Sequence, residues 1–86
     1  MSNNYRKVLD GEVFIKVIGF PVPKGHVVDG EAMWVTQIYG DDNEGIGVLN
    51  STPAFCTEVK LGDLIQYGGG SDHLKPRYLG KAKSDE

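Results

Sequence analysis

The chain has 86 residues, which is enough for one domain with a single small core. Its formal net charge is −3, from 12 acidic and 9 basic residues, and so small an imbalance predicts no nucleic-acid partner. The single cysteine excludes an intramolecular disulfide framework.

No apolar run approaches the roughly 20 residues that span a bilayer, and no basic start followed by an apolar run predicts a secretory signal. We therefore expect a cytoplasmic protein without a membrane partner. We expect one domain over residues 1–86, with flexible polar ends at 1–4 and 81–86. Twelve glycines and four prolines interrupt the chain, which disfavours a helix bundle and favours short strands joined by turns.

The first strong element is "EVFIKVIGF" at 12–20, where β-branched and aromatic residues predict a strand that is largely buried on both faces. The segment before it, "NNYRKVLDG" at 3–11, places Tyr5, Val8 and Leu9 at helical spacing. A short helix over 3–11 is therefore an open alternative to an all-β chain.

Four more segments follow in the pattern of a meander. "MWVTQIY" at 33–39 alternates and predicts the second strand, and the polar loop at 41–45 leads into a return strand at 46–50. In this loop, we expect Gly45 to supply a positive φ. "AFCTEVK" at 54–60 alternates as well and predicts the fourth strand.

"LIQY" at 64–67 predicts the fifth strand, and "RYL" at 77–79 a short edge strand. Together these segments predict a mainly β fold, or an α+β fold if the N-terminal helix forms. We expect five to six antiparallel strands in a meander that curls into a half-open barrel.

The most unusual stretch is "QYGGGSDH" at 66–73. A phosphate cradle of the known kinds leads into a helix, but no lysine follows here and Pro76 interrupts any helix. The stretch is better interpreted as a flexible exit from the fifth strand. Its glycine N–H groups, with Tyr67, His73 and Lys75 nearby, still offer a place for a small anionic ligand such as a nucleotide.

Trp34, the only tryptophan, is either a stacking platform for a ring or a core anchor of the second strand. Aromatic, glycine and polar residues therefore make up the ligand-binding candidates. They are Trp34, Tyr67, Gly68, Gly69, Gly70, Ser71, His73 and Lys75.

Catalysis has weaker support. Glu31 and Asp63 could share acid and base roles only if they meet, and Asp63 after Gly62 is typical of turn chemistry. The two histidines, His26 and His73, have no ligand partner at close spacing except Asp72, which is adjacent to His73. We expect no catalytic residue, no metal site and no cofactor.

Cys56 lies within the predicted strand at 54–60, where a buried and unreactive thiol is expected. No neighbouring cation or helix N-terminus is evident that would lower its pKa and make it a nucleophile.

Four short segments of the chain resemble the YegJ-like domains, a family of small bacterial proteins. The matching residues are Glu31, Met33, Trp34 and Val35, then Gly47, Leu49, Asn50 and Pro53, then Gly62 and Asp63, and finally Ser71 and Asp72. His73 stands where this family often has a tryptophan. The resemblance spans residues 28 to 73 and implies a compact β-rich or α+β intracellular domain, without an activity to carry over.

We therefore predict a non-catalytic binding or interaction module that acts through a protein partner or through self-association at an edge strand. The alternative is a domain that binds an anionic small molecule near the glycine loop at 66–75. A third reading, a small hydrolase-type enzyme using His73 with Asp72 or Glu31, lacks a visible set of nucleophile, base and orienting group.

Overall fold

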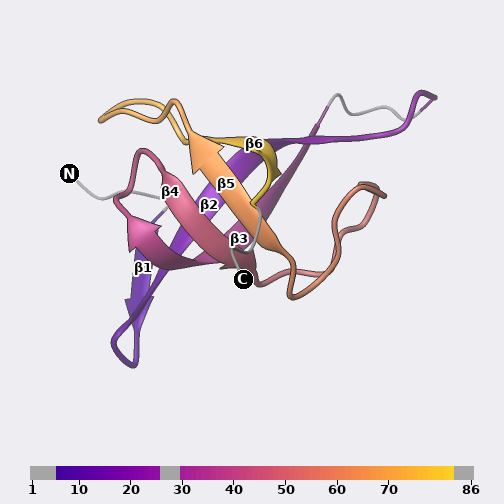
Figure 1. Cartoon of the computed structure of the whole chain (residues 1–86). Coiled ribbons are helices and arrows are strands. Elements are labelled where there is room, and N and C mark those ends of the chain that lie inside the picture. The colour runs from indigo at the N-terminus through magenta and orange to yellow at the C-terminus, as the bar shows by residue number, and fades with distance from the viewer. Residues whose placement is uncertain (1–5, 26–29, 83–86) are drawn as a thin grey trace.

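The computed structural model describes residues 6–25 and 30–82, and these contain strands but no helix. No helix in these ranges is long and apolar enough to cross a membrane. The strands are β1 (Arg6–Leu9), β2 (Glu12–Pro21), β3 (Gly30–Gly40), β4 (Gly45–Leu49), β5 (Leu64–Gly68) and β6 (Arg77–Lys81). Consecutive strands pair antiparallel in one sheet, so the predicted meander of five to six antiparallel strands is confirmed (Figure 1).

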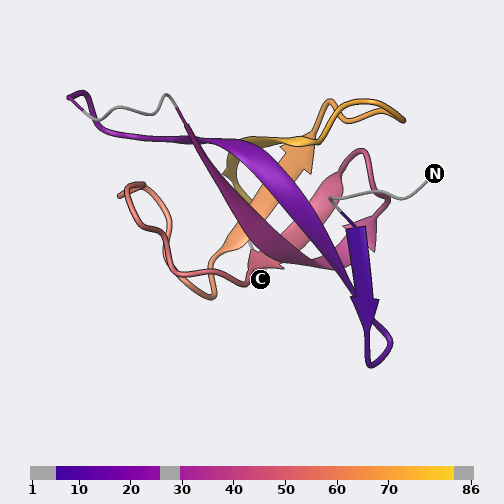
Figure 2. The ribbon, with the colours of Figure 1, turned by 180° about the vertical axis from the view of Figure 1, so that it is seen from behind.

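The sheet closes on itself because β2 also pairs with β6. Ile18 lies opposite Arg77 in a parallel pairing, and the Ile18 N–H donates to the Pro76 carbonyl at 3.0 Å. β2 to β6 therefore form a five-stranded barrel, which is closed further than the half-open barrel that the sequence predicted. β1 pairs with the first part of β2 and stands outside this barrel (Figure 2).

The alternative of a helix over 3–11 is wrong for its described part, because Arg6–Leu9 form β1. A two-residue turn, Asp10 and Gly11, with φ values of 53° and 83°, joins β1 to β2. Positive φ at both positions gives a turn whose twist matches that of two paired strands. The backbone of β1 is thus bonded to β2, and a helix there would leave that edge of β2 unpaired.

The predicted strand at 54–60 is also wrong, since the chain between Leu49 and Leu64 is irregular. Cys56 and Val59 from this segment are nevertheless buried in the core. The burial expected for the Cys56 thiol is therefore confirmed, although the element around it is a loop. This loop lies on the opposite side of the barrel from β1 in both views (Figures 1 and 2).

The core follows the alternation of the strands. Met33 and Val35 point inward from β3, while Trp34 between them is half-buried on the outer face. Near the point of closure, the Phe20 and Tyr78 rings stack with their centroids 4.6 Å apart. The fully enclosed or nearly enclosed apolar side chains are Ile15, Val17, Phe20, Met33, Val35, Leu49, Cys56, Val59, Ile65 and Tyr67.

β2 is less enclosed than predicted. Ile15 and Val17 are buried on the inner face, but Phe14 and Ile18 on the other face are only half-buried. Phe14 and Ile18 are therefore part of the outer surface of the barrel.

Gly47 allows β4 to approach β3 closely. A Cβ atom at this position would lie against Val35 Cγ1 and 2.5 Å from the Thr36 carbonyl oxygen. Gly30 is also in a strand, but a Cβ there would meet no atom closer than 3.5 Å. The two glycines therefore differ in packing while sharing a strand environment.

We expect Gly47→Ala to destabilise the fold by about 1–3 kcal/mol, because the added methyl group overpacks the β3–β4 contact. Gly30→Ala is the matched control and should change the stability by less than about 0.5 kcal/mol. Urea unfolding of the two variants and the parent chain measures both values. Equal losses in the two variants would contradict the close approach at Gly47.

Candidate functional site

Tyr67 lies on the inner face of β5 with only 1% of its surface exposed. Its hydroxyl accepts a hydrogen bond from Gln37 Nε2 at 2.8 Å and donates one to the Asp41 carbonyl at 2.9 Å. Burial raises the pKa of Tyr67; the Gln37 hydrogen bond opposes this, and the charges of Asp41 and Asp42 add to it. The hydroxyl is therefore protonated and engaged within the fold.

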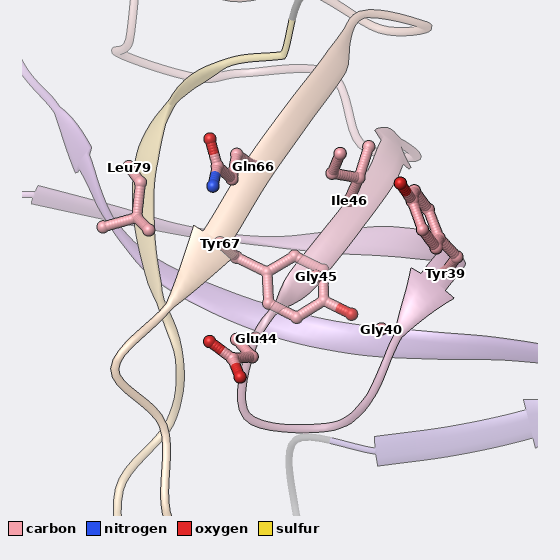
Figure 3. A pocket seen from close by; sticks show the side chains of 8 residues that line it. All are labelled: Tyr39, Gly40, Glu44, Gly45, Ile46, Gln66, Tyr67 and Leu79. Atoms are coloured by element: carbon pink, nitrogen blue, oxygen red, sulfur yellow. The ribbon is translucent and has the colours of Figure 1, made fainter.

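A hollow of about 320 Å³ lies over Tyr67, next to the β3–β4 loop, and we call it the Tyr67 hollow (Figure 3). The Tyr67 ring lies in the middle of the view, with Tyr39 and Leu79 on opposite sides. Tyr39 is 67% exposed and Leu79 is 60% exposed. The residues that line the hollow are Tyr39, Gly40, Glu44, Gly45, Ile46, Gln66, Tyr67 and Leu79.

The β3–β4 loop shapes one side of this hollow. The Asp41 carboxylate accepts the N–H groups of Asn43 at 2.8 Å and Glu44 at 3.0 Å, which fixes the turn. The positive φ that the sequence predicted at Gly45 lies at Gly40 instead, with φ of 109°. The turn places the Glu44 side chain on the wall of the hollow.

The glycine stretch forms a hydrogen-bonded turn beside the same loop. The Gly70 N–H donates to the Asn43 carbonyl at 3.0 Å, and the Ser71 N–H donates to the Leu74 carbonyl at 2.9 Å. The His73 N–H donates to the Ser71 hydroxyl at 3.3 Å. The Gly70 N–H, one of the glycine donors that the sequence offered to an anion, is thus used inside the protein, as is the neighbouring Ser71 N–H.

The other candidates from this stretch are not among the residues that line the Tyr67 hollow. Gly68 is buried at the end of β5, where a Cβ would lie 2.9 Å from Leu79 Cδ1, and Gly69 has a positive φ of 76°. His73 is exposed and Lys75 is half-buried. Of the eight sequence candidates, the structure brings only Tyr67 into this hollow.

Trp34 belongs to a second, smaller hollow on the outer face of the barrel. The Nζ atoms of Lys7 and Lys16 lie 4.5 Å and 5.1 Å from the centroid of a Trp34 ring, within cation–π range. The hollow measures about 200 Å³, and its lining residues, which we call the Trp34 platform, are Lys7, Leu9, Phe14, Trp34 and Asn50. Sequence reasoning missed the two lysines, although strand pairing places Lys16 opposite Trp34.

The outer face next to the Trp34 platform is unusually apolar. Strand register places Phe14 opposite Thr36, Thr36 opposite Val48 and Val48 opposite Leu64, so one row crosses four strands. All four side chains are half-buried. The alternation of apolar and polar faces that a solvated sheet shows is therefore weak here.

The two carboxylates considered for catalysis have separate structural roles. Glu31 accepts the backbone N–H groups of three successive residues, at 2.6, 3.0 and 2.8 Å for Ala54, Phe55 and Cys56. Burial opposes ionisation, but these three hydrogen bonds hold the pKa of Glu31 below its ordinary value of 4.5. The carboxylate thereby ties the 50–63 loop to the start of β3.

Asp63 accepts the Lys60 N–H at 3.0 Å and pairs with Lys81 Nζ at 3.4 Å. The turn chemistry predicted for Asp63 is therefore confirmed. Among residues 6–25 and 30–82, no group of three or more His, Cys, Asp or Glu side chains could hold a metal ion. His26, which the sequence raised as a possible ligand, lies outside the described residues.

Residues 1–72 match the profile of a family described as "Uncharacterized protein conserved in bacteria (DUF2314)". No curated protein and no solved structure matches the chain. The family match confirms the sequence-based expectation of a small conserved bacterial domain.

Glu31→Gln keeps the shape of this side chain and removes its charge. Because the folded pKa of Glu31 lies below 4.5, the charged carboxylate stabilises the fold above that pH, and its contribution is lost as the pH falls through the folded pKa. We expect the variant to be about 1–3 kcal/mol less stable at pH 7. This difference should shrink at pH 3.

Urea unfolding at both pH values measures the difference, with Asp72→Asn as the control for loss of an exposed carboxylate. The control should match the parent chain at pH 7. A Glu31→Gln difference that is the same at pH 7 and pH 3 would contradict the role given to the charge.

Proposed function

We propose that this chain, which belongs to the bacterial family DUF2314, is a non-catalytic protein-interaction module that binds an extended polypeptide segment along β1. The observation that carries the proposal is the open outer edge of β1. Addition of a strand to an exposed sheet edge is a recurring mode of peptide recognition, in which backbone hydrogen bonds provide the affinity. The narrower YegJ-like relationship stays a prediction.

The edge is open because β1 pairs with β2 alone among the described strands, and all four of its residues are exposed. In a hairpin with a two-residue turn, the flanking pair Leu9 and Glu12 exchanges both backbone hydrogen bonds, and the next such pair is Lys7 and Phe14. The N–H and C=O groups of Val8 therefore point away from β2. They are available to an added strand.

The side chains of β1 favour a polypeptide partner as well. Val8 is 52% exposed and Leu9 is 58% exposed, and they lie on opposite faces of the strand. Leu9 belongs to the Trp34 platform, so an added strand would lie beside an existing apolar surface. Such a strand would cover apolar area on both faces of β1.

The extended segment can come from a different protein or from a second copy of this chain. In an antiparallel pairing that sets Val8 opposite Val8 of a second copy, Lys7 of each copy would lie opposite Leu9 of the other. The experiment below separates the two sources by the mass of the product.

The sequence also suggested an anionic ligand near the 66–75 loop, and that stays a prediction. It has less support than the edge, because the N–H groups of Gly70 and Ser71 already donate within the protein. The enzyme alternative has less support again, since Glu31 is bonded to three backbone N–H groups and His73 lies exposed in a turn.

A photo-reactive benzoylphenylalanine at position 9, in the native host cell, tests the proposal. We expect a discrete cross-linked product, with twice the mass of the chain for a second copy and another mass for a different protein. Val8→Pro in the same chain should remove most of the product, because proline has no N–H to donate at the edge.

Val8→Thr is the matched control, since threonine keeps the N–H group, and its product should persist. A ¹⁵N spectrum of Val8→Pro checks that the barrel is intact. Benzoylphenylalanine at position 72, an exposed position away from β1, is the control for unspecific cross-linking. The proposal fails if position 9 gives no product, if position 72 gives the same product, or if the product survives Val8→Pro in a folded chain.

A further inference from the structure

We infer that the Tyr67 hollow is a binding site for an organic cation, with an alkylammonium group as the preferred ligand. This group is carried by a lysine side chain and by free primary amines. This ligand is positively charged, whereas the ligand that the sequence suggested near the glycine loop at 66–75 is an anion. The inference concerns the end of the barrel formed by β3 to β6 and does not depend on strand addition at β1.

The charge of the lining is the first support. Glu44 contributes a carboxylate to the hollow, and none of the eight lining residues is cationic. Within the described residues Glu44 has no ion pair, whereas Asp42 in the same loop pairs with Arg6 at 3.0 Å. Asp41 and Asp42 stand in the same loop, and their charges add, after burial and against the Gln37 hydrogen bond, to the raised pKa of Tyr67.

The shape of the walls is the second support. Tyr39 and Leu79 are large, largely exposed side chains on either side, and the Tyr67 ring lies between them (Figure 3). Tyr67 is only 1% exposed and its hydroxyl is already bonded on both sides, so it forms the closed floor of the hollow, and the Tyr39 ring is the exposed aromatic surface. Tyrosine rings attract cations, and Leu79 can pack against an alkyl chain.

The size of the hollow and the available polar groups narrow the ligand class. At about 320 Å³ the hollow is at the small end of ligand sites, which suits one side chain or a small amine. An anion would be repelled by Glu44. A neutral apolar ligand would desolvate the Glu44 carboxylate without compensating it. An alkylammonium group satisfies the carboxylate and the apolar walls together.

Titration of the ¹⁵N-labelled chain with n-butylammonium, followed by NMR, tests the site. We expect saturable shifts confined to the amides of residues 39–46, 66–68 and 79. Glu44→Gln, which keeps the size of the side chain, should weaken binding about fivefold to tenfold. Asp72→Asn removes one negative charge from an exposed position outside the hollow and should leave the affinity unchanged.

Three further compounds test whether the positive charge is required for binding and whether the ligand is a lysine side chain or a free amine. n-Butanol has the same butyl chain without a charge, and butyrate has four carbons and a negative charge; neither should give a saturable shift. Capped lysine that binds at least as tightly as butylammonium assigns the site to a lysine side chain of a polypeptide, and weaker binding assigns it to a free amine. The inference is overturned if butylammonium does not saturate, if butyrate binds equally, or if Glu44→Gln binds as the parent does.

Discussion

β2 pairs with three other strands, and the rest of the structure depends on which of its ten residues pair with each. One edge pairs with β3 along most of its length, while the other edge is shared between β1 and β6. The change of partner occurs between Ile15, which pairs with β1, and Ile18, which pairs with β6. The register with β3 shifts just beyond, between Val17 and Phe20, where Gly19 has φ of 82°. Because β6 meets β2 at Ile18 and closes the barrel, β1 is left outside with an open edge.

Closure also explains why the polar groups of this small domain are mostly structural. The 50–63 loop contributes Cys56 and Val59 to the core, and Glu31 holds that loop through three backbone N–H groups. Asp63 and Asp41 bond backbone N–H groups of their own turns in the same way. No buried side-chain polar atom of the described residues lacks a partner. The surface features to which we assign function are the edge of β1, with the Trp34 platform beside it, and the Tyr67 hollow.

The sequence predicts the elements whose signals are local. Alternation at 33–39 predicts β3, and the segment at 64–67 predicts β5. The polar loop after β3 predicts the hairpin that joins β3 to β4. The segments at 3–11 and 54–60 were misassigned, because distant contacts decide them. Residues 6–9 pair with β2, and the N–H groups of residues 54–56 bond a carboxylate 23 to 25 positions earlier. The Tyr67 hollow draws on β3, β4, β5 and β6, so no local pattern reveals it.

Hydrogen exchange of the backbone amides of β1, measured by NMR on the dilute chain, tests the open edge most directly. The Lys7 and Leu9 amides bond β2 and should exchange at least about tenfold more slowly than in an unfolded chain. The Val8 amide between them should exchange close to the unfolded rate. If the Val8 amide is protected as strongly as its two neighbours, the outer edge of β1 is already covered in the isolated chain and cannot be the binding surface.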